Sequence, residues 1–349
     1  MVSASETAAM RRALVLAARG PAVGPNPRVG CVILDASGVP VAEGWHHGAG
    51  EPHAEVEALA ADRSGAGRTA VVTLEPCHHV GRTGPCTRAL LDAGITRVVI
   101  ASRDPNPLAA GGAEALREAG ADVETGVLAT ESDALNRRWM FALANGRPFV
   151  TWKFATTLDG RSAAADGTSR WITGPAARAD VHARRATSDA VLVGTGTVLA
   201  DDPRLTVRDT DGRETGRQPL RVVLGRRPLP PDARVLDDAA PTLCLSHRDP
   251  ALALAELHAR EIRHVWLEGG PTVAAAFLRA GLVDEVLAYV APALLGAGPA
   301  AVADLGIPTL DRAERLVITD VRRLGDDILV VASPQGRPGP TGRTASEGT

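Results

Sequence analysis

Three residues with metal-binding side chains, His53, Cys77 and Cys86, are spaced along the N-terminal part of the sequence in a way that could form a catalytic site. One imidazole and two thiolates can hold a zinc ion and leave a fourth position open for water. Zinc lowers the pKa of such a water toward neutrality. Glu55 follows the histidine by two positions and, not being needed as a ligand, can carry protons. These four residues predict a zinc-dependent hydrolytic site.

The order of these residues favours removal of an amino group. His-x-Glu followed by Pro-Cys and a second cysteine is typical of zinc deaminases, in which the cysteines are close together. Here the longer segment 78–85 separates them, and it contains two histidines, one arginine and two glycines. Its backbone N–H groups and Arg82 can bind a phosphate. We therefore expect a phosphorylated small substrate, with a longer solvated turn as the alternative.

The remaining cysteines and several histidines have ordinary structural interpretations. Cys31 and Cys244 fall within predicted strands, and we interpret both as core residues rather than ligands. The other histidines, such as His182, His258 and His264, are interpreted as structural. A structural zinc site, or plain buried cysteines, remains the alternative for the motif itself.

The elements that must position this motif alternate between helices and strands. Ser3 and Glu6 have the spacing of a capping box at the start of the first helix. The patterns predict helices at 3–19, 55–62, 87–93, 113–119 and 131–141, and strands at 29–34, 71–74, 97–101 and 122–125. Such alternation predicts an α/β layer with a largely parallel sheet. Cys77 ends a strand and Cys86 precedes a helix, whose N-terminus favours a thiolate.

A second α/β unit follows the Asn-Gly-Arg-Pro segment at 145–148, where the sequence predicts a domain boundary. Strands are predicted at 149–155, 190–194, 220–224, 242–245, 264–267, 285–291 and 328–332, and helices at 175–186, 250–260 and 271–280. Residues 208–217 are polar and predict a loop. We expect domains at 1–146 and 147–333, followed by a disordered tail at 334–349.

The second unit carries two glycine-bearing turns after predicted strands, at 194–197 and 268–272. Backbone N–H groups at such turns can bind a pyrophosphate. Neither turn has the G-x-G-x-x-G pattern, so each taken alone is more often a simple turn. Pro271 suits a first helical position, which favours the second turn as the binding site.

Lys153 lies in an apolar predicted strand, where an unpaired ammonium is costly. We therefore predict that Lys153 orients a substrate oxygen or stabilises charge on it, with Glu268 nearby; an exposed lysine at a strand edge is the alternative. Arg226 and Arg227 follow another strand, and such a cationic pair could bind the 2′-phosphate of NADPH.

Composition excludes several classes of protein. The net charge is −3 and aromatic residues make up 3% of the chain, which opposes a protein that coats nucleic acid or stacks bases. We see no apolar stretch long enough to span a bilayer and no secretory signal. Four cysteines are too few for a disulfide scaffold, so we expect a cytoplasmic protein with reduced thiols.

Several longer sequence segments resemble a known protein family. PNPRVGCV, GEPHAEVEAL, TLEPCHHVGRTGPC and DPNP resemble the deaminase half of the bifunctional riboflavin-biosynthesis deaminase–reductase family. KFATTLDGR, SRWITG, ARRATSDAVLVGTGTVLADDPRLTVR and EGGPTVAAAFLRAGLVDE resemble its reductase half. The resemblance extends over about residues 5 to 333. His78 departs from the family pattern, in which a small serine is common.

The resemblance implies two domains of α/β class, an N-terminal cytidine-deaminase-like α/β/α layer and a C-terminal dihydrofolate-reductase-like α/β domain. The first would hydrolytically deaminate 2,5-diamino-6-(5-phosphoribosylamino)pyrimidin-4-one, using zinc. The second would use NADPH to reduce the ribose of the product, 5-amino-6-(5-phosphoribosylamino)uracil, to a ribityl chain. It also suggests a homodimer or homotetramer.

The resemblance also assigns roles to individual residues. It places the zinc ligands on His53, Cys77 and Cys86 and the proton carrier on Glu55. It places substrate contacts of the first half on Asn26, His79, Arg82, Asp104 and Asn106, and those of the second half on Ser169, Arg185, Leu205, Arg208 and Glu268. It places cofactor contacts on Ala155, Trp171, Thr197, Asp201, Gly270, Pro271, Thr272, Val273, Ala274, Ala275 and Ala276. Arg185 and Arg208 would clamp the substrate phosphate, because guanidinium forks suit that geometry.

Three alternatives stay open at this point. A nucleic-acid deaminase with an accessory domain would need a basic groove and exposed aromatic residues. A non-catalytic module stabilised by zinc would explain the ligands but not Glu55. A protein in which only one half is active is also compatible with the sequence, because small geometric errors abolish catalysis.

Overall fold

The computed structural model describes residues 1–61, 68–79, 84–209 and 211–336. The chain divides into two compact units, the first ending at Asn145 and the second beginning at Gly146. Asn145 is also the last residue of helix α5 (Ala129–Asn145), and Gly146 has a φ of 61°. A left-handed residue at this position ends a helix, and glycine adopts it without steric cost. The local sequence therefore stops α5 where the two units separate.

The first unit contains a five-stranded sheet with the order β2-β1-β3-β4-β5. Its strands are β1 (Gly30–Leu34), β2 (Pro40–Trp45), β3 (Arg68–Leu74), β4 (Ile95–Ser102) and β5 (Asp122–Thr125). Its helices besides α5 are α1 (Ala4–Ala17), α2 (Ala54–Ala61), α3 (Cys86–Asp92) and α4 (Gly112–Glu118). The predicted helix at the N-terminus is confirmed, since the Ser3 and Glu6 side chains form both hydrogen bonds of a capping box.

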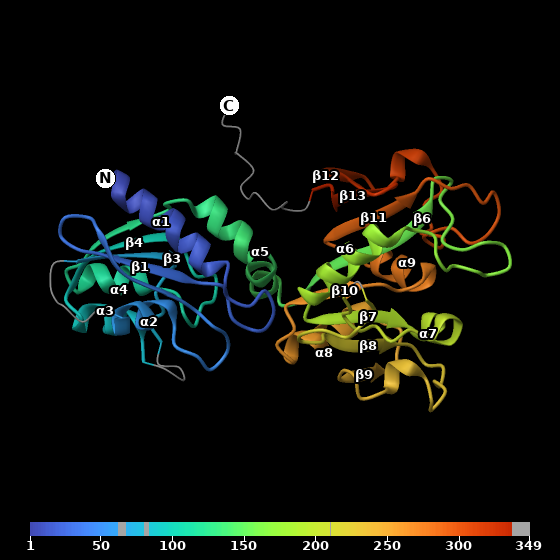
Figure 1. The fold of residues 1–349 in the computed structure, drawn as a ribbon, viewed down its shortest axis with the longest axis horizontal. Coiled ribbons are helices and arrows are strands. Elements are labelled where there is room, and N and C mark those ends of the chain that lie inside the picture. The colour runs from blue at the N-terminus through green and yellow to red at the C-terminus, as the bar shows by residue number, and fades with distance from the viewer. Residues whose placement is uncertain (62–67, 80–83, 210, 337–349) are drawn as a thin grey trace. The chain divides into compact units, whose positions relative to one another are not determined.

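Helices cover both faces of this sheet, because alternate strand residues point to opposite sides (Figure 1). Val32, Val71 and Val99 pack with α1 on one face. Cys31, Val72 and Val98 pack with α2, α3 and α4 on the other face. This three-layer arrangement places the N-termini of α2 and α3 near the end of β3.

The sheet differs from the expected one in having a mixed direction. β1 pairs antiparallel with both β2 and β3, whereas β3, β4 and β5 are parallel. The sequence prediction missed β2, whose residues PVAEGW include few strand formers and lie at the edge of the sheet. A tight turn creates the hairpin, in which Asp35 accepts hydrogen bonds from the N–H groups of Ser37 and Val39.

The second unit contains an eight-stranded sheet with the order β12-β13-β11-β6-β10-β7-β8-β9. Its strands are β6 (Phe149–Thr157), β7 (Ala190–Gly194), β8 (Leu220–Leu224), β9 (Thr242–Leu245), β10 (His264–Leu267), β11 (Glu285–Ala291), β12 (Leu316–Leu324) and β13 (Asp327–Pro334). Its α-helices are α6 (Pro175–Ala186), α7 (Thr195–Asp201), α8 (Pro250–Ala259) and α9 (Pro271–Arg279). All strands from β11 to β9 are parallel, and only the β11–β13–β12 edge is antiparallel.

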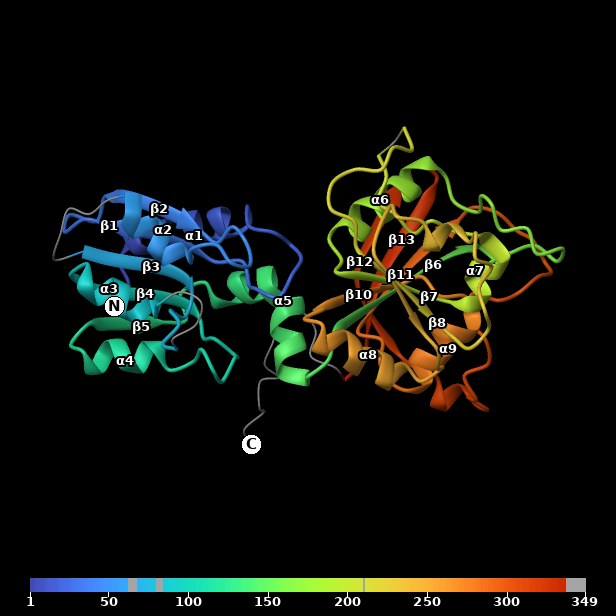
Figure 2. The ribbon, with the colours of Figure 1, turned by 90° about the horizontal axis from the view of Figure 1, so that it is seen from below.

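Helices lie on both faces of this sheet (Figure 2), and each face carries its own hydrophobic core. Helices α8 and α9 pack on one face, against residues such as Val150 and Leu192. Helix α6 packs on the other face, against residues such as Trp266 and Tyr289. Six predicted strands of this unit begin at the predicted residue, and the seventh, at 328–332, lies within β13.

Four local expectations about the second unit were wrong or incomplete. Cys244 is exposed on the edge strand β9 and is not a core residue. β12 was missed because its side chains are exposed along almost the whole strand and show no alternation. α7 was interpreted as a turn because glycines flank its first residue. β13 reaches Pro334, and most of the tail expected to be disordered, 337–349, lies outside the described residues.

Candidate metal centre and charged cluster

His53, Cys77 and Cys86 come together at one edge of the first sheet. His53 directly precedes α2, Cys77 follows β3, and Cys86 is the first residue of α3. Their donor atoms all lie within 4.8 Å of one another. His53 Nδ1 is 3.2 Å from Cys86 Sγ and 3.6 Å from Cys77 Sγ. The backbone N–H of Cys86 donates to Cys77 Sγ at 3.4 Å, so the start of α3 also stabilises charge on that sulfur.

The charges of these groups depend on one another. Hydrogen bonds from Cys86 and His53 lower the pKa of Cys77, whereas the bond to Cys77 and burial raise the pKa of Cys86. The hydrogen bond to Cys77 raises the pKa of His53. Burial raises the pKa of Glu55, which is 3% exposed and hydrogen-bonded to Cys86. A carboxyl with a raised pKa can both take and give a proton near neutral pH.

This donor set fits zinc. One imidazole nitrogen and two sulfurs are the soft and borderline donors that zinc prefers, and three protein ligands leave room for a water. A divalent cation between the sulfurs favours the thiolate form of both. Glu55 lies beside the ligands without belonging to the group of possible donors.

Asn26 lies near the metal centre and is held by His46. The Nδ2 group of Asn26 is 2.9 Å from Nε2 of His46, and the Nδ1 group of His46 is 2.9 Å from the carbonyl oxygen of Pro52. Because a carbonyl can only accept, His46 carries its proton on Nδ1 and accepts from Asn26. The rings of His46 and His53 are 5.4 Å apart. The sequence analysis did not single out His46.

The other predicted substrate contacts of the first unit lie in two segments. Asp104 follows β4, and its backbone N–H donates to the buried Glu75. Burial raises the pKa of Asp104 to about 6. The backbone N–H of Asn106 donates to the Asp104 carboxylate, while Asn106 Oδ1 accepts from a later backbone N–H. His79 is exposed, and Arg82 lies outside the described residues.

A second cluster forms at the carboxyl ends of the parallel strands in the second unit, where such sheets commonly bind ligands. Glu268, after β10, accepts hydrogen bonds from Arg185 Nε at 3.0 Å and Nη2 at 2.8 Å, and from Trp266 Nε1 at 2.6 Å. Burial opposes its charge, but Arg185 and Lys153 lower the pKa of Glu268 to about 2. Arg185 Nη1 donates to the carbonyl oxygen of Thr206 at 2.6 Å. Glu268 therefore stays ionised, and Arg185 is fully engaged.

Lys153 lies beside this pair on β6, a strand in the middle of the sheet. Burial lowers the pKa of Lys153, and the Glu268 carboxylate partly offsets that effect. Its Nζ is 5.9 Å from the centre of the Tyr289 ring. The amino-acid composition also distinguishes this residue, because Lys153 is the only lysine of a chain with 38 Lys and Arg residues. A strand position that keeps the one lysine in an arginine-rich chain indicates chemistry that a guanidinium cannot perform.

The glycine turn before α9 fits a phosphate-bearing cofactor. Among the described residues, the backbone N–H groups of Gly269 and Thr272 have no hydrogen-bond partner, while that of Gly270 donates to Thr197 Oγ1 at 3.1 Å. A Cβ on Gly269 would lie 2.8 Å from Cβ of Val273. The turn therefore requires glycine and leaves N–H donors at a helix N-terminus, where anions bind.

The other predicted contacts of the second unit lie on several different elements. Ala155 is half-buried on β6, and Trp171 is 71% exposed with the Arg178 guanidinium 4.6 Å from its ring. Ser169 Oγ donates to Asp201 at 3.4 Å. Of the remaining positions, Pro271, Thr272, Val273, Ala274, Ala275 and Ala276 form the first turns of α9. Arg226 and Arg227 are exposed, and Arg227 Nη2 is 2.8 Å from the place where a Cβ of Gly196 would lie.

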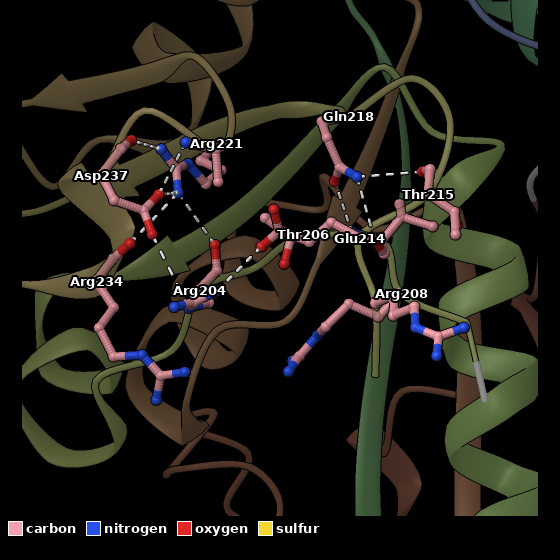
Figure 3. A network of polar contacts seen from close by, with 12 residues as sticks. Arg204, Thr206, Arg208, Glu214, Thr215, Gln218, Arg221, Arg234 and Asp237 are labelled. Atoms are coloured by element: carbon pink, nitrogen blue, oxygen red, sulfur yellow. Dashed lines mark hydrogen bonds and ion pairs between the residues drawn. The ribbon is translucent and has the colours of Figure 1, made fainter. Parts of the chain in front are cut away.

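Arg221 organises the segment between α7 and β8 (Figure 3). Its side chain is fully buried, and it donates to the Asp237 carboxylate and to the carbonyl oxygens of Arg204 and Arg234. The segment includes Leu205, which has a φ of 59° that non-glycine residues rarely adopt. Such a backbone persists only where the surroundings hold it in place. The sequence analysis did not single out Arg221.

Comparisons with known proteins decide the family. The family described as cytidine and deoxycytidylate deaminase zinc-binding region matches residues 3–102, and the RibD C-terminal domain matches residues 148–330. The riboflavin biosynthesis protein RibD of Mycobacterium tuberculosis is 51% identical over 308 residues, covering 88% of this chain and 90% of that protein. The chain belongs to the RibD family.

Other RibD proteins are similar over most of the chain. Escherichia coli RibD is 41% identical and covers 91% of this chain and 96% of its own length. The structure of Acinetobacter baumannii RibD, at 40% identity, has a TM-score of 0.86 and covers 95% of this chain and 99% of that one. A deaminase/reductase of Thermotoga maritima, at 35% identity, has a TM-score of 0.84 and covers 95% of this chain and 99% of its own.

Family membership confirms the predicted fold class and the class of enzyme. This RibD protein is a bifunctional enzyme of riboflavin biosynthesis that deaminates and then reduces, with Zn²⁺ and NADPH as its cofactors. The substrates of this family are small pyrimidines. No helix among the described residues has the length and apolar character needed to cross a membrane.

Proposed function

We propose that this RibD protein deaminates 2,5-diamino-6-(5-phosphoribosylamino)pyrimidin-4-one within residues 1–146 and reduces 5-amino-6-(5-phosphoribosylamino)uracil within residues 147–333. The main support is the presence of a three-donor metal centre in the first unit and of a Lys153–Glu268–Arg185 cluster in the second, in which Arg185 is buried and the other two residues are half-buried. The similar protein of Thermotoga maritima is named a diaminohydroxyphosphoribosylaminopyrimidine deaminase and 5-amino-6-(5-phosphoribosylamino)uracil reductase, which agrees with this pair of substrates.

In the deamination step, His53, Cys77 and Cys86 hold the zinc ion. When bound, zinc lowers the pKa of a water molecule at its open position. Glu55 accepts the proton of the attacking water and delivers it to the leaving ammonia. Asn26, fixed by His46, presents its amide oxygen and remaining N–H to the pyrimidine edge. Asp104, Asn106, His79 and Arg82 complete the substrate contacts.

In the reduction step, NADPH supplies a hydride when bound. The conversion of a ribosyl to a ribityl group adds that hydride and a proton, and it turns the ring oxygen into a hydroxyl group. Lys153 orients this oxygen and stabilises the charge that develops on it. Glu268 keeps Lys153 in place, while Arg185 and Trp266 hold Glu268. Ser169, Leu205 and Arg208 bind the rest of the substrate.

In this proposal, the residues at the carboxyl ends of β6, β7 and β10 would bind NADPH. The N–H groups of Gly269 and Thr272, at the start of α9, bind its phosphates, and residues Gly270 to Ala276 surround this contact. The rest of the cofactor-binding site is formed by Ala155, Trp171, Thr197 and Asp201. Arg226 binds the 2′-phosphate together with Arg227.

We also propose a cytoplasmic homodimer or homotetramer. The four cysteines are free, which fits a reducing compartment. β12 is an edge strand with exposed apolar side chains, Val317 at 51%, Ile318 at 61% and Val321 at 57%. An edge of this kind pairs readily with another chain. Replacement of Ile318 by Asp should convert the oligomer to monomers in light scattering, and an unchanged mass would place the interface elsewhere.

The first experiment incubates the purified protein with the diaminopyrimidinone ribotide, with and without NADPH, and identifies the products by mass spectrometry. Exchange of an amino group for oxygen without NADPH, and gain of two hydrogens after its addition, is the expected result. Deamination alone would leave the second half of the proposal without support. No conversion by a folded protein that contains zinc would overturn the substrate assignment.

A further inference from the structure

His182 lies on the face of α6 that carries Arg185, since residues three apart on a helix are neighbours. Its Nδ1 accepts a hydrogen bond from the backbone N–H of Arg208 at 3.2 Å. A backbone N–H can only donate, so Nδ1 carries no proton. The neutral ring therefore carries its proton on Nε2. Among the described residues this Nε2–H group has no partner, and the side chain is half-buried rather than sealed.

The groups around His182 keep its ring neutral. Burial, Arg185 and Arg208 lower the pKa of His182 to about 4, with a smaller contribution from Lys153, and the Glu268 carboxylate opposes the shift. At neutral pH the imidazole is thus a fixed, uncharged donor surrounded by cations. An uncharged donor can approach these cations without the repulsion that another positive charge would meet.

The positive charge around this donor is only partly neutralised. Glu268 pairs with Arg185, and every nitrogen of the Arg185 guanidinium is already engaged with Glu268 or Thr206. The Arg208 guanidinium, by contrast, has no hydrogen-bond partner among the described residues, and its Nε is buried. Burial and the nearby Arg185 lower the pKa of Arg208. A free guanidinium next to a free N–H donor suits a phosphate monoester.

We propose that His182 is a substrate-binding residue of the reductase, whose Nε2–H donates to the phosphate of the phosphorylated pyrimidine while Nδ1 holds the Arg208 backbone in place. Arg208 supplies the charge of this subsite. The proposal rests on the proposed reductase function. A phosphate monoester also occurs on NADPH, as its 2′-phosphate, so the test must separate the two sources.

The test compares the full-length wild type with H182L, H182Q and a matched control, H258L, whose histidine lies on α8 against the other face of the sheet. Calorimetry measures binding of ribose 5-phosphate, with ribose as the uncharged reference, and steady-state kinetics measure KM for the ribotide and for NADPH. H182L should weaken ribose 5-phosphate binding and raise KM for the ribotide by about tenfold to a hundredfold, the effect of one hydrogen bond to a charged group. KM for NADPH should not change.

H182Q should retain most of the binding, because its amide can accept from Arg208 and donate to the phosphate. H258L should behave as wild type. A raised KM for NADPH with unchanged ribose 5-phosphate binding would assign the phosphate to the cofactor and overturn the proposal. Equal losses in H182L and H182Q that affect only kcat or thermal stability would show a purely structural histidine. A wild type that binds ribose 5-phosphate but reduces no ribotide would contradict the proposed function and leave the binding comparison intact.

Discussion

The metal centre of the first unit and the charged cluster of the second unit achieve reactivity in different ways. The metal centre gathers three donor atoms within 4.8 Å from the ends of three neighbouring elements. The charged cluster gathers Lys153, His182, Arg185 and Glu268 from β6, α6 and the end of β10. The chemistry of the metal centre depends on the type of its ligand atoms. The chemistry of the charged cluster depends on how burial and neighbouring charges shift the pKa values of ordinary side chains.

This difference has consequences for mutation. In the metal centre, a single group such as the Glu55 carboxylate transfers the proton, and no neighbouring group can replace it. In the charged cluster, the ionisation state of one group depends on its neighbours, since Lys153 and Arg185 keep Glu268 ionised. A substitution in the cluster should therefore change charge and stability as well as turnover.

The largest effect is expected for E55Q. Loss of the proton carrier should lower the rate of deamination by about a hundredfold to ten-thousandfold, while zinc content and reductase turnover are retained. Product formation by mass spectrometry and metal analysis measure this, with E118Q on the exposed end of α4 as the control. Deamination by E55Q at the wild-type rate would contradict the role of Glu55 as the proton carrier.

K153M should lower reductase turnover by about a hundredfold, because one stabilising group at the reacting oxygen is lost. Deamination should continue at the wild-type rate. K153R keeps the charge but should not restore turnover, since a planar guanidinium does not replace an ammonium in a buried strand position. Equal loss of both activities in K153M would contradict the assignment of this lysine to the second reaction.

E268Q should destabilise the second unit in a pH-dependent way. The pKa of Glu268 is about 2 in the folded protein and ordinarily 4.5, so its charge stabilises the fold above about pH 4.5 and this stabilisation is lost as the pH falls toward 2. Urea unfolding at pH 7 should show that the free energy of unfolding of E268Q is roughly 3 kcal/mol lower than that of the wild type. This difference should become smaller below pH 4.5.

The matched control for Glu268 is E214Q. Glu214 forms an exposed ion pair with Arg204, which should contribute about 1 kcal/mol or less at any pH. A loss in E268Q that stays constant between pH 7 and pH 3 would mean that the carboxylate is not held ionised by Arg185 and Lys153.

The smallest effect is expected for the cofactor arginines. R226A should reduce the preference for NADPH over NADH, and the double variant R226A/R227A should reduce it by about tenfold, because Arg227 lies against Gly196. Kinetics with both cofactors measure the ratio, and R217A in the exposed loop is the control. An unchanged ratio in the double variant would remove both residues from the 2′-phosphate site.

Sequence patterns predicted most elements because their signals are local. Period-two and helical patterns, Ser3 with Glu6, and Pro271 at a helix start act over a few residues. β2 and β12 were missed because edge strands have little burial to impose a pattern. The mixed direction of the first sheet was also missed, since pairing direction depends on contacts between segments distant in sequence.

The sequence by itself determined the metal centre and the family. Ligand types and spacing specify zinc chemistry because coordination needs particular donor atoms, and long matching stretches specify RibD. Only the tertiary structure decided that Arg185 is occupied by Glu268, that Arg221 holds the segment carrying Arg208, and that His182 faces the same cluster. Hydrogen-bond partners and pKa shifts arise from burial and from charges on other elements, and these exist only once the chain has folded.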